Sequence, residues 1–152
     1  MVKRRSSRYY RVIGAIGTNR LVTRLHPVVY RASGGRLFGR VLGITTVVLE
    51  ATGARSGLPR PVPVFAMEDG EALIVIASNG GKPDGPAWAA NLRAHPTLAI
   101  RHRRRVRTMR ARELEGAERA RAWAIATAAY PGYDDYAARI PHKIPVFAME
   151  PV

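Results

Sequence analysis

The chain has 152 residues, of which 47% are hydrophobic, contains no cysteine, and carries a formal net charge of +14. This composition indicates one globular domain and excludes disulfides, thiolate metal sites and cysteine nucleophiles. No apolar run reaches the roughly 20 residues of a membrane-spanning helix and no export signal is recognisable, so we expect a cytoplasmic protein.

Residues 1–40 are expected to form a basic amphipathic segment. Between Tyr9 and Tyr30, apolar residues recur every three or four positions, which predicts a helix interrupted near Gly17 and Pro27. Two interpretations stay open: a helix packed on the rest of the fold, or peripheral contact of residues 3–40 with the anionic inner face of the cell membrane. The basic residues, all before the first acid, are Lys3, Arg4, Arg5, Arg8, Arg11, Arg20, Arg24, Arg31, Arg36 and Arg40.

Residues 41–152 carry a strand pattern, because apolar and β-branched runs alternate with turn residues. Helices are expected at residues 86–94 and 115–129, with a short one around 133–136. The strands come first as hairpins, and one helical segment precedes the last strand. This order favours a closed antiparallel barrel, whose first three strands are expected to form a meander. The six expected strands are Ile44–Ala51, Arg60–Met67, Ala72–Ser78, Leu98–His102, Val106–Leu114 and Ile144–Met149.

Several short motifs fail to support other functions. Ser56 stands one position too late after Gly53 for the nucleophile of a serine hydrolase, and residues 80–82 lack the rest of a phosphate-binding loop. The basic run 101–107 has no interleaved aromatic residues, so we interpret it as a solvated hairpin tip and expect no nucleic-acid partner. No metal is expected, because the four histidines lie far apart: His26, His95, His102 and His142.

Three segments in register resemble the deazaflavin (F420)-dependent nitroreductase family of actinobacterial proteins. They are Thr52–Arg60, Ala77–Lys82 followed by Pro86–Leu92, and Tyr130–Tyr136. The resemblance extends over residues 45–151. It implies a mainly β (α+β) fold, the six-stranded antiparallel split β-barrel, with coenzyme F420 as cofactor. It further implies an oxidoreductase that passes hydride between the reduced deazaflavin and an organic acceptor such as a quinone or a nitroaromatic.

The residues of these segments suit an anionic, planar cofactor. Arg55 and Arg60 flank a glycine-rich tip that can hold the phosphodiester and carboxylate tail implied by the resemblance. Glycines at 80 and 81 let the backbone approach a flat ring. A plain polar hairpin tip and ordinary core packing of Trp88 stay open as alternatives. The predicted cofactor-binding residues are Arg55, Ser56, Gly57, Arg60, Ala77, Ser78, Asn79, Gly80, Gly81, Lys82, Trp88 and Asn91.

The acceptor is expected beside three tyrosines, Tyr130, Tyr133 and Tyr136, which together with Phe65 are the predicted substrate-binding residues. By resemblance, these phenols and Ser78 are the predicted catalytic groups, which bond the acceptor oxygen on which charge develops. Tyrosines that merely cap the edge of the core are the alternative. Phe65 stands where some nitro-reducing relatives carry a tyrosine, which argues against prodrug-type nitroreduction and leaves a quinone, including a lipid quinone, as the favoured acceptor.

Other functions stay open on the sequence alone. Ala54 stands where many relatives carry a cationic residue, so we expect weaker binding of the cofactor tail than in those relatives. The alternatives are an FMN- or tetrapyrrole-type split-barrel reductase, a protein that binds F420 without turnover, and a basic nucleic-acid or membrane adaptor. The sequence does not indicate an oligomeric state.

Overall fold

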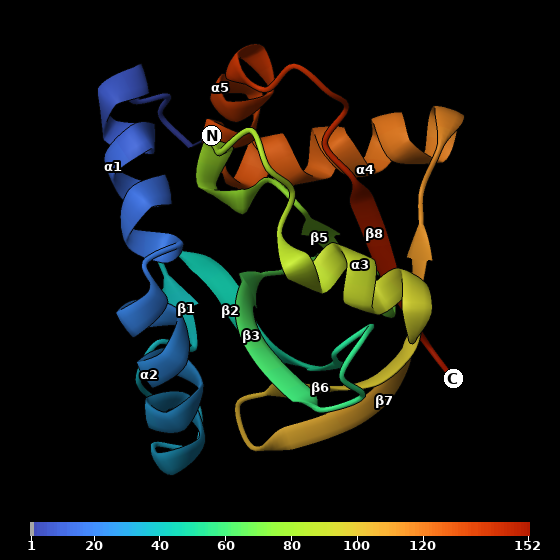
Figure 1. Ribbon diagram of the computed structural model, residues 1–152. Coiled ribbons are helices and arrows are strands. Elements are labelled where there is room, and N and C mark those ends of the chain that lie inside the picture. The colour runs from blue at the N-terminus through green and yellow to red at the C-terminus, as the bar shows by residue number, and fades with distance from the viewer. Residues whose placement is uncertain (1) are drawn as a thin grey trace.

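The computed structural model describes residues 2–152, in which one antiparallel sheet curls around a core and helices flank it (Figure 1). The order across the sheet is β1-β2-β6-β7-β8-β5-β4, and β3 also pairs with β2. The fold class expected from the sequence is therefore confirmed. The strands are β1 (Arg40–Val41), β2 (Ile44–Thr52), β3 (Pro59–Phe65), β4 (Met67–Asp69), β5 (Ala72–Ile76), β6 (Thr97–His102), β7 (Arg105–Glu113) and β8 (Val146–Pro151).

The count of eight strands differs from the expected six because one expected strand is bent. The segment 59–69 breaks at Ala66, whose N–H donates to the carbonyl of Thr45 at 2.9 Å. Before the break β3 pairs with β2, and after it β4 pairs with β5, so the two halves bond to different parts of the sheet. A strand that changes partners at a corner is how a sheet closes on itself. The other added strand, β1, has two residues.

The expected meander of the first three strands is confirmed in its two hairpins, because β3 pairs with β2 and β4 pairs with β5. The other neighbour of β5 is β8, which the local pattern did not predict, in a register that sets Val75 opposite Phe147. Both residues are buried, as are most residues of β8. An apolar strand from the end of the chain gains more by entering the middle of the sheet than by lying at its edge, and this long-range pairing leaves no local signal in the sequence.

The helices flank the sheet and position the functional segments. The predicted break near Gly17 is confirmed, because α1 ends there and the Asn19 side chain caps α2. The predicted interruption at Pro27 is wrong. Proline removes one helical N–H donor, but Pro27 is buried and α2 continues past it, so packing outweighs that loss. The helices are α1 (Ser7–Gly17), α2 (Arg20–Ala32), the 3-10 turn η1 (Asn79–Gly81), α3 (Ala87–Ala94), α4 (Gly116–Ala129) and α5 (Gly132–Arg139).

Two groups of buried side chains form the core, one on each face of the curled sheet. The inner group combines Leu49, Val75 and Met109 of the sheet with Trp88 and Leu92 of α3. The outer group packs other sheet residues against α1, α4 and α5 and contains most of the tyrosines. Among the described residues, no helix has both the length and the apolar character needed to cross a membrane. The division of the chain at residue 40 stays a prediction.

Candidate functional site

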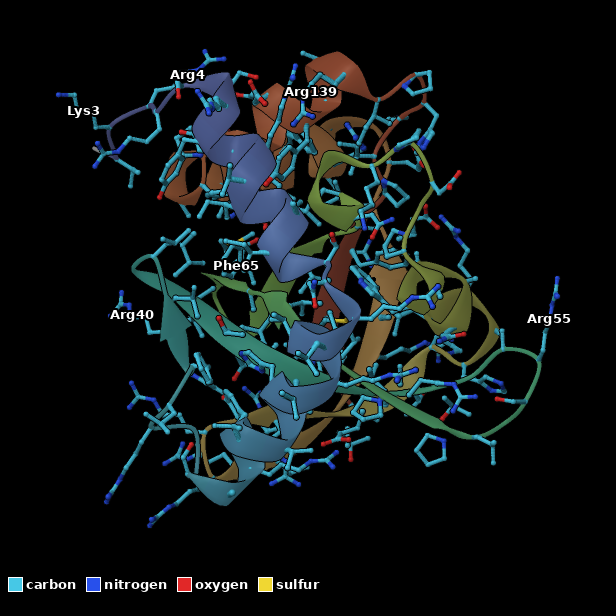
Figure 2. All side chains as sticks on the ribbon, turned by 60° about the vertical axis from the view of Figure 1, so that its left-hand side comes forward. Lys3, Arg4, Arg40, Arg55, Phe65 and Arg139 are labelled. Atoms are coloured by element: carbon cyan, nitrogen blue, oxygen red, sulfur yellow. The ribbon has the colours of Figure 1, made fainter. Side chains whose placement is uncertain are left out.

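The connection between β2 and β3 is a compact cationic tip, residues 53–60. Its backbone folds on itself, since the N–H of Gly53 donates to the carbonyl of Leu58 at 2.8 Å and the N–H of Gly57 to the carbonyl of Gly53 at 2.9 Å. Gly57 has a φ of +66°, which favours glycine. Figure 2 shows the Arg55 side chain projecting from this tip into solvent. The tip therefore presents its polar groups outward.

The two arginines of the tip have no carboxylate partner. Within residues 2–152, neither Arg55 nor Arg60 forms an ion pair, and the Arg60 guanidinium only donates to the carbonyl of Pro59 at 3.3 Å. Unpaired guanidiniums bind phosphate and carboxylate groups through paired, charge-assisted hydrogen bonds. The donor set of the tip, completed by the Ser56 hydroxyl, thus fits the anionic end of a ligand.

After β5 the chain makes a left-handed bend, residues 78–82. Asn79, Gly80 and Gly81 have φ values of 49°, 63° and 83°, a run of positive angles that side chains other than asparagine seldom tolerate. The Asn79 amide fixes the bend by donating to the carbonyl of Asp84 at 2.7 Å. Ala77 and Ser78, at the end of β5, are buried. Lys82 follows as the last residue of the bend and donates its N–H to the carbonyl of Asn79 at 3.2 Å.

Helix α3 joins the tip to the bend. It begins shortly after the bend, and the buried Asn91 side chain in its middle accepts a hydrogen bond from the N–H of Ala54 at 2.9 Å. The sequence analysis missed this contact, for which no local signal exists. Trp88 lies in the inner core, its ring 5.9 Å from that of Phe147. Its packing matches the alternative of a core residue, and the cofactor roles of Trp88 and Asn91 stay predictions.

The three predicted tyrosines lie together and are 2–4% exposed. The ring of Tyr130 packs edge-on against Tyr133 at 5.0 Å and lies 5.6 Å from the ring of Phe65. The structure thus brings all four predicted substrate-binding residues into one cluster. The bend reaches this cluster, because a Cβ added at Gly81 would lie 2.7 Å from the ring of Tyr136. Only a glycine leaves room for this approach.

Helix α1 covers the cluster and contributes a tyrosine that the sequence analysis did not select. The Tyr10 ring packs on that of Tyr130 at 5.4 Å, and the Tyr10 carbonyl accepts a hydrogen bond from the Tyr136 hydroxyl at 2.9 Å. Because a phenol has one proton, Tyr136 must accept from the Tyr130 hydroxyl, 2.8 Å away. A Cβ at Gly14 would overlap the carbonyl oxygen of Gly80, so α1 also rests directly on the bend.

Burial keeps these phenols protonated. It raises the pKa values of Tyr130, Tyr133 and Tyr136, and for Tyr130 the hydrogen bond with Tyr136 raises the pKa further. At neutral pH the three phenols therefore carry no negative charge, and the protons of Tyr130 and Tyr136 become available to another oxygen only when their present hydrogen bonds break. Such a group suits the stabilisation of an oxygen that gains charge during a reaction.

The raised pKa values predict an alkaline limit to stability. Because these pKa values lie above the unfolded value of about 10, the unfolded chain loses the protons first, so stability that is complete below about pH 10 falls above it. We expect the ultraviolet signal of phenolate to show Tyr130, Tyr133 and Tyr136 ionising only as the protein unfolds. Reversible ionisation of all six tyrosines in the folded protein would contradict this.

Comparison with known proteins identifies the family. The model of the family "F420H(2)-dependent quinone reductase" matches residues 22–151. A quinone reductase of that description from Mycobacterium tuberculosis (strain H37Rv) is 38% identical over 78 residues, 51% of this chain and 52% of that protein. The structure of an F420-H2 dependent reductase, FDR-A, has a TM-score of 0.65 and 40% identity over 69% of this chain and 93% of that one. A structure described as a domain-swapped dimer has a TM-score of 0.68 and 33% identity, covering 84% and 94%.

The fold and these likenesses define the class as the F420-dependent split-barrel oxidoreductases. The chain belongs to the F420H(2)-dependent quinone reductase family, and coenzyme F420 is its cofactor. The resemblance drawn from the sequence is confirmed, with a quinone rather than a nitro compound in the family's description. The match spans about half (52%) of the curated quinone reductase, so the activity and acceptor of this chain are proposals.

The residues present fit F420 at both ends. Arg55 and Arg60 offer unpaired guanidiniums for its anionic tail. The glycines of the bend let its backbone pack closely against Gly14 and the ring of Tyr136, and the same lack of side chains suits the close approach of a flat ring. The individual roles of the predicted site residues stay predictions.

Proposed function

We propose that this chain binds reduced F420 along the tip, α3 and the bend and reduces a quinone-type acceptor beside the tyrosines. The observation that carries the proposal is the link from Ala54 to Asn91 of α3, which ties the cationic tip to the helix that follows the glycine bend. Two segments suited to opposite ends of one anionic, planar molecule are thereby held in a fixed relation. When bound, reduced F420 supplies the hydride.

The protein itself holds the cofactor in place and polarises the acceptor. Arg55, Arg60 and Ser56 bind the anionic tail, and the bend brings backbone against the ring. Once α1 moves and the Tyr10 carbonyl no longer takes its proton, the phenol of Tyr136, next to Gly81, donates to the acceptor oxygen that gains charge, with Ser78 as the second candidate donor. Hydride transfer requires reacting atoms about 3 to 3.5 Å apart, which favours a flat acceptor packed against the aromatic cluster.

The proposed activity predicts that the protein speeds the oxidation of reduced F420 by a soluble quinone such as menadione under anaerobic conditions. Stopped-flow absorbance of F420 measures the rate. A nitroaromatic should react more slowly, because Phe65 supplies no phenol beside Tyr130. A rate equal to that without protein would overturn the proposed activity. The Tyr136→Phe variant should lose about 10- to 100-fold in kcat, the effect of one hydrogen bond to a charged oxygen, with binding of F420 unchanged.

A lipid quinone is the acceptor that the surface of α1 and α2 favours. These helices expose apolar side chains, among them Leu21 at 65%, Leu25 at 51% and Val28 at 61%. Arginines stand between them in the sequence, and Figure 2 shows Lys3 and Arg4 at the start of the chain, beyond the first turn of α1. Exposed apolar residues with flanking cations suit an anionic bilayer surface. We therefore propose that residues 3–40 make peripheral contact with the inner face of the membrane.

Vesicle binding tests this contact. The protein should float with phosphatidylglycerol vesicles and remain behind with phosphatidylcholine vesicles, because both apolar burial and charge are needed. The Leu25→Gln/Val28→Gln variant should lose most binding, since each buried side chain contributes about 1.5 to 3 kcal/mol. The matched control is Val106→Gln, which alters a side chain of β7 that is 49% exposed. Equal loss in both variants, or binding to neither vesicle, would contradict the membrane contact.

A further inference from the structure

A second cationic feature lies away from the cofactor segments. A cavity of ≈ 300 Å³ opens between the C-terminal end of α2, the loop that follows it, and the tip of the β6–β7 hairpin. The residues that line it are Gly34, Gly35, Arg36, Gly39, Arg40 and Arg103. None of them belongs to the tip, the bend or the tyrosine cluster. The cavity therefore has no part in the site described above.

The walls of this cavity are fixed by buried contacts. Tyr30, which is fully buried, donates its hydroxyl proton to the carbonyl of Thr46 at 3.1 Å and accepts from the N–H of Arg103 at 2.5 Å. A Cβ at Gly35 would overlap the Cα of Arg103, so the loop and the hairpin tip touch through their backbones. The two chain regions that supply the arginines are thus locked together by the fold.

The arginines of the cavity lack counter-charges. Within the part of the chain that the structure describes, Arg36, Arg40 and Arg103 form no ion pair. Glu50, the acid closest in the sequence to Arg36 and Arg40, is already engaged by Arg31 and by Arg101. Like charges held together raise the energy of the fold, and a bound anion offsets that repulsion.

Backbone strain marks the same place. Phe38 has a φ of 62°, a left-handed conformation that is uncommon for such a residue, whereas the φ of 56° at Arg103 is what the two-residue turn between β6 and β7 requires. Strain of this kind collects where a ligand is held. The N–H groups of Gly34 and Gly35 are not available to a ligand, because they donate to the carbonyls of Arg31 and Tyr30. The guanidiniums are therefore the main donors that the cavity offers, and such groups suit a tetrahedral oxyanion.

We propose that Arg36, Arg40 and Arg103 form a binding site for a phosphate group, and that this phosphate is the headgroup of an anionic phospholipid. The edge of the loop exposes Leu37 at 56%, Phe38 at 50% and Leu42 at 47%, which favours a ligand with acyl chains over a free phosphate. Figure 2 shows Arg40 at the outer edge of the molecule, where a bilayer surface can reach it. The site deepens the proposed membrane contact and does not depend on hydride transfer.

Titration calorimetry with the full chain tests the site. One probe is a short-chain phosphatidylglycerol kept below its micelle concentration, and the other is inorganic phosphate. The site variant is Arg36→Gln/Arg40→Gln/Arg103→Asn, with asparagine at 103 because it tolerates a positive φ. The control is Arg105→Gln/Arg107→Gln/Arg110→Gln, which removes the same charge from exposed positions of β7.

We expect the site variant to bind the lipid probe about tenfold or more weakly and the control less than about twofold more weakly. Tighter binding of the lipid than of inorganic phosphate supports the headgroup assignment. Equal affinities support the oxyanion site and assign it to a soluble phosphate. Equal losses in both variants, or no binding of either probe to the parent, overturn the site. Because calorimetry with monomeric probes involves no bilayer, failure here is distinct from failure of vesicle binding through Leu25 and Val28.

Discussion

The Arg55→Gln/Arg60→Gln variant should bind F420 at least about 100-fold more weakly than the parent, because each charge-assisted hydrogen bond contributes about 1.5 to 3 kcal/mol. Both side chains are exposed and neither forms an ion pair within residues 2–152, so their loss leaves the fold intact. Fluorescence titration with F420 at low salt measures the effect. The affinity of the parent for F420 should also fall as the salt concentration rises, and it should fall more steeply than the affinity of the variant.

The control for this prediction removes the same charge elsewhere. Arg107→Gln/Arg110→Gln changes two exposed arginines of β7, on strand positions that contribute nothing to the tip. Its F420 affinity should stay within about twofold of the parent, since distant exposed charges are screened. If the two double variants lose affinity equally, the net charge rather than the tip attracts the cofactor, and the assignment of Arg55 and Arg60 is wrong.

The Gly14→Ala variant should release α1 from the tyrosine cluster. The new Cβ would overlap the Gly80 carbonyl oxygen, and overpacking of this kind costs about 1 to 3 kcal/mol. Hydrogen exchange of the α1 amides should accelerate about 10- to 100-fold, because a packing cost of this size raises the equilibrium constant for local opening of α1 by the same factor. The Tyr136 hydroxyl would lose its acceptor, the Tyr10 carbonyl, and become free to bond another oxygen.

A matched glycine in the same helix provides the control. A Cβ at Gly17 meets nothing within 4 Å, so Gly17→Ala should leave the exchange of α1 unchanged or slightly slowed. Unchanged exchange in both variants would show that α1 does not rest on the bend. The acceptor can contact the tyrosines, which are 2–4% exposed, only when something moves, and α1 is the element that covers them.

Local patterns predicted most elements of the fold. The alternating runs of β2, β6 and β7 and the helices α3, α4 and α5 lie within a few residues of their expected positions. The basic run 101–107 includes the expected exposed hairpin tip. These features depend on neighbouring residues, which is why they can be found in a sequence.

The features that were wrong or missed depend on residues far apart in the chain. The position of β8 beside β5, the corner at Ala66 and the continuation of α2 through Pro27 are all decided by tertiary packing. The same holds in the site. The resemblance selected the tyrosines of α5, but the cover that Tyr10 and Gly14 provide follows from the path of α1 across the bend, to which no motif points.

The structure of the protein with F420 bound tests the central claim most directly. We expect the phosphodiester and carboxylate tail within hydrogen-bond distance of Arg55 and Arg60, the deazaflavin ring against residues 78–82, and the tyrosine cluster on the open side of the ring. A complex in which the tail lies away from the tip, or the ring away from the bend, would contradict it.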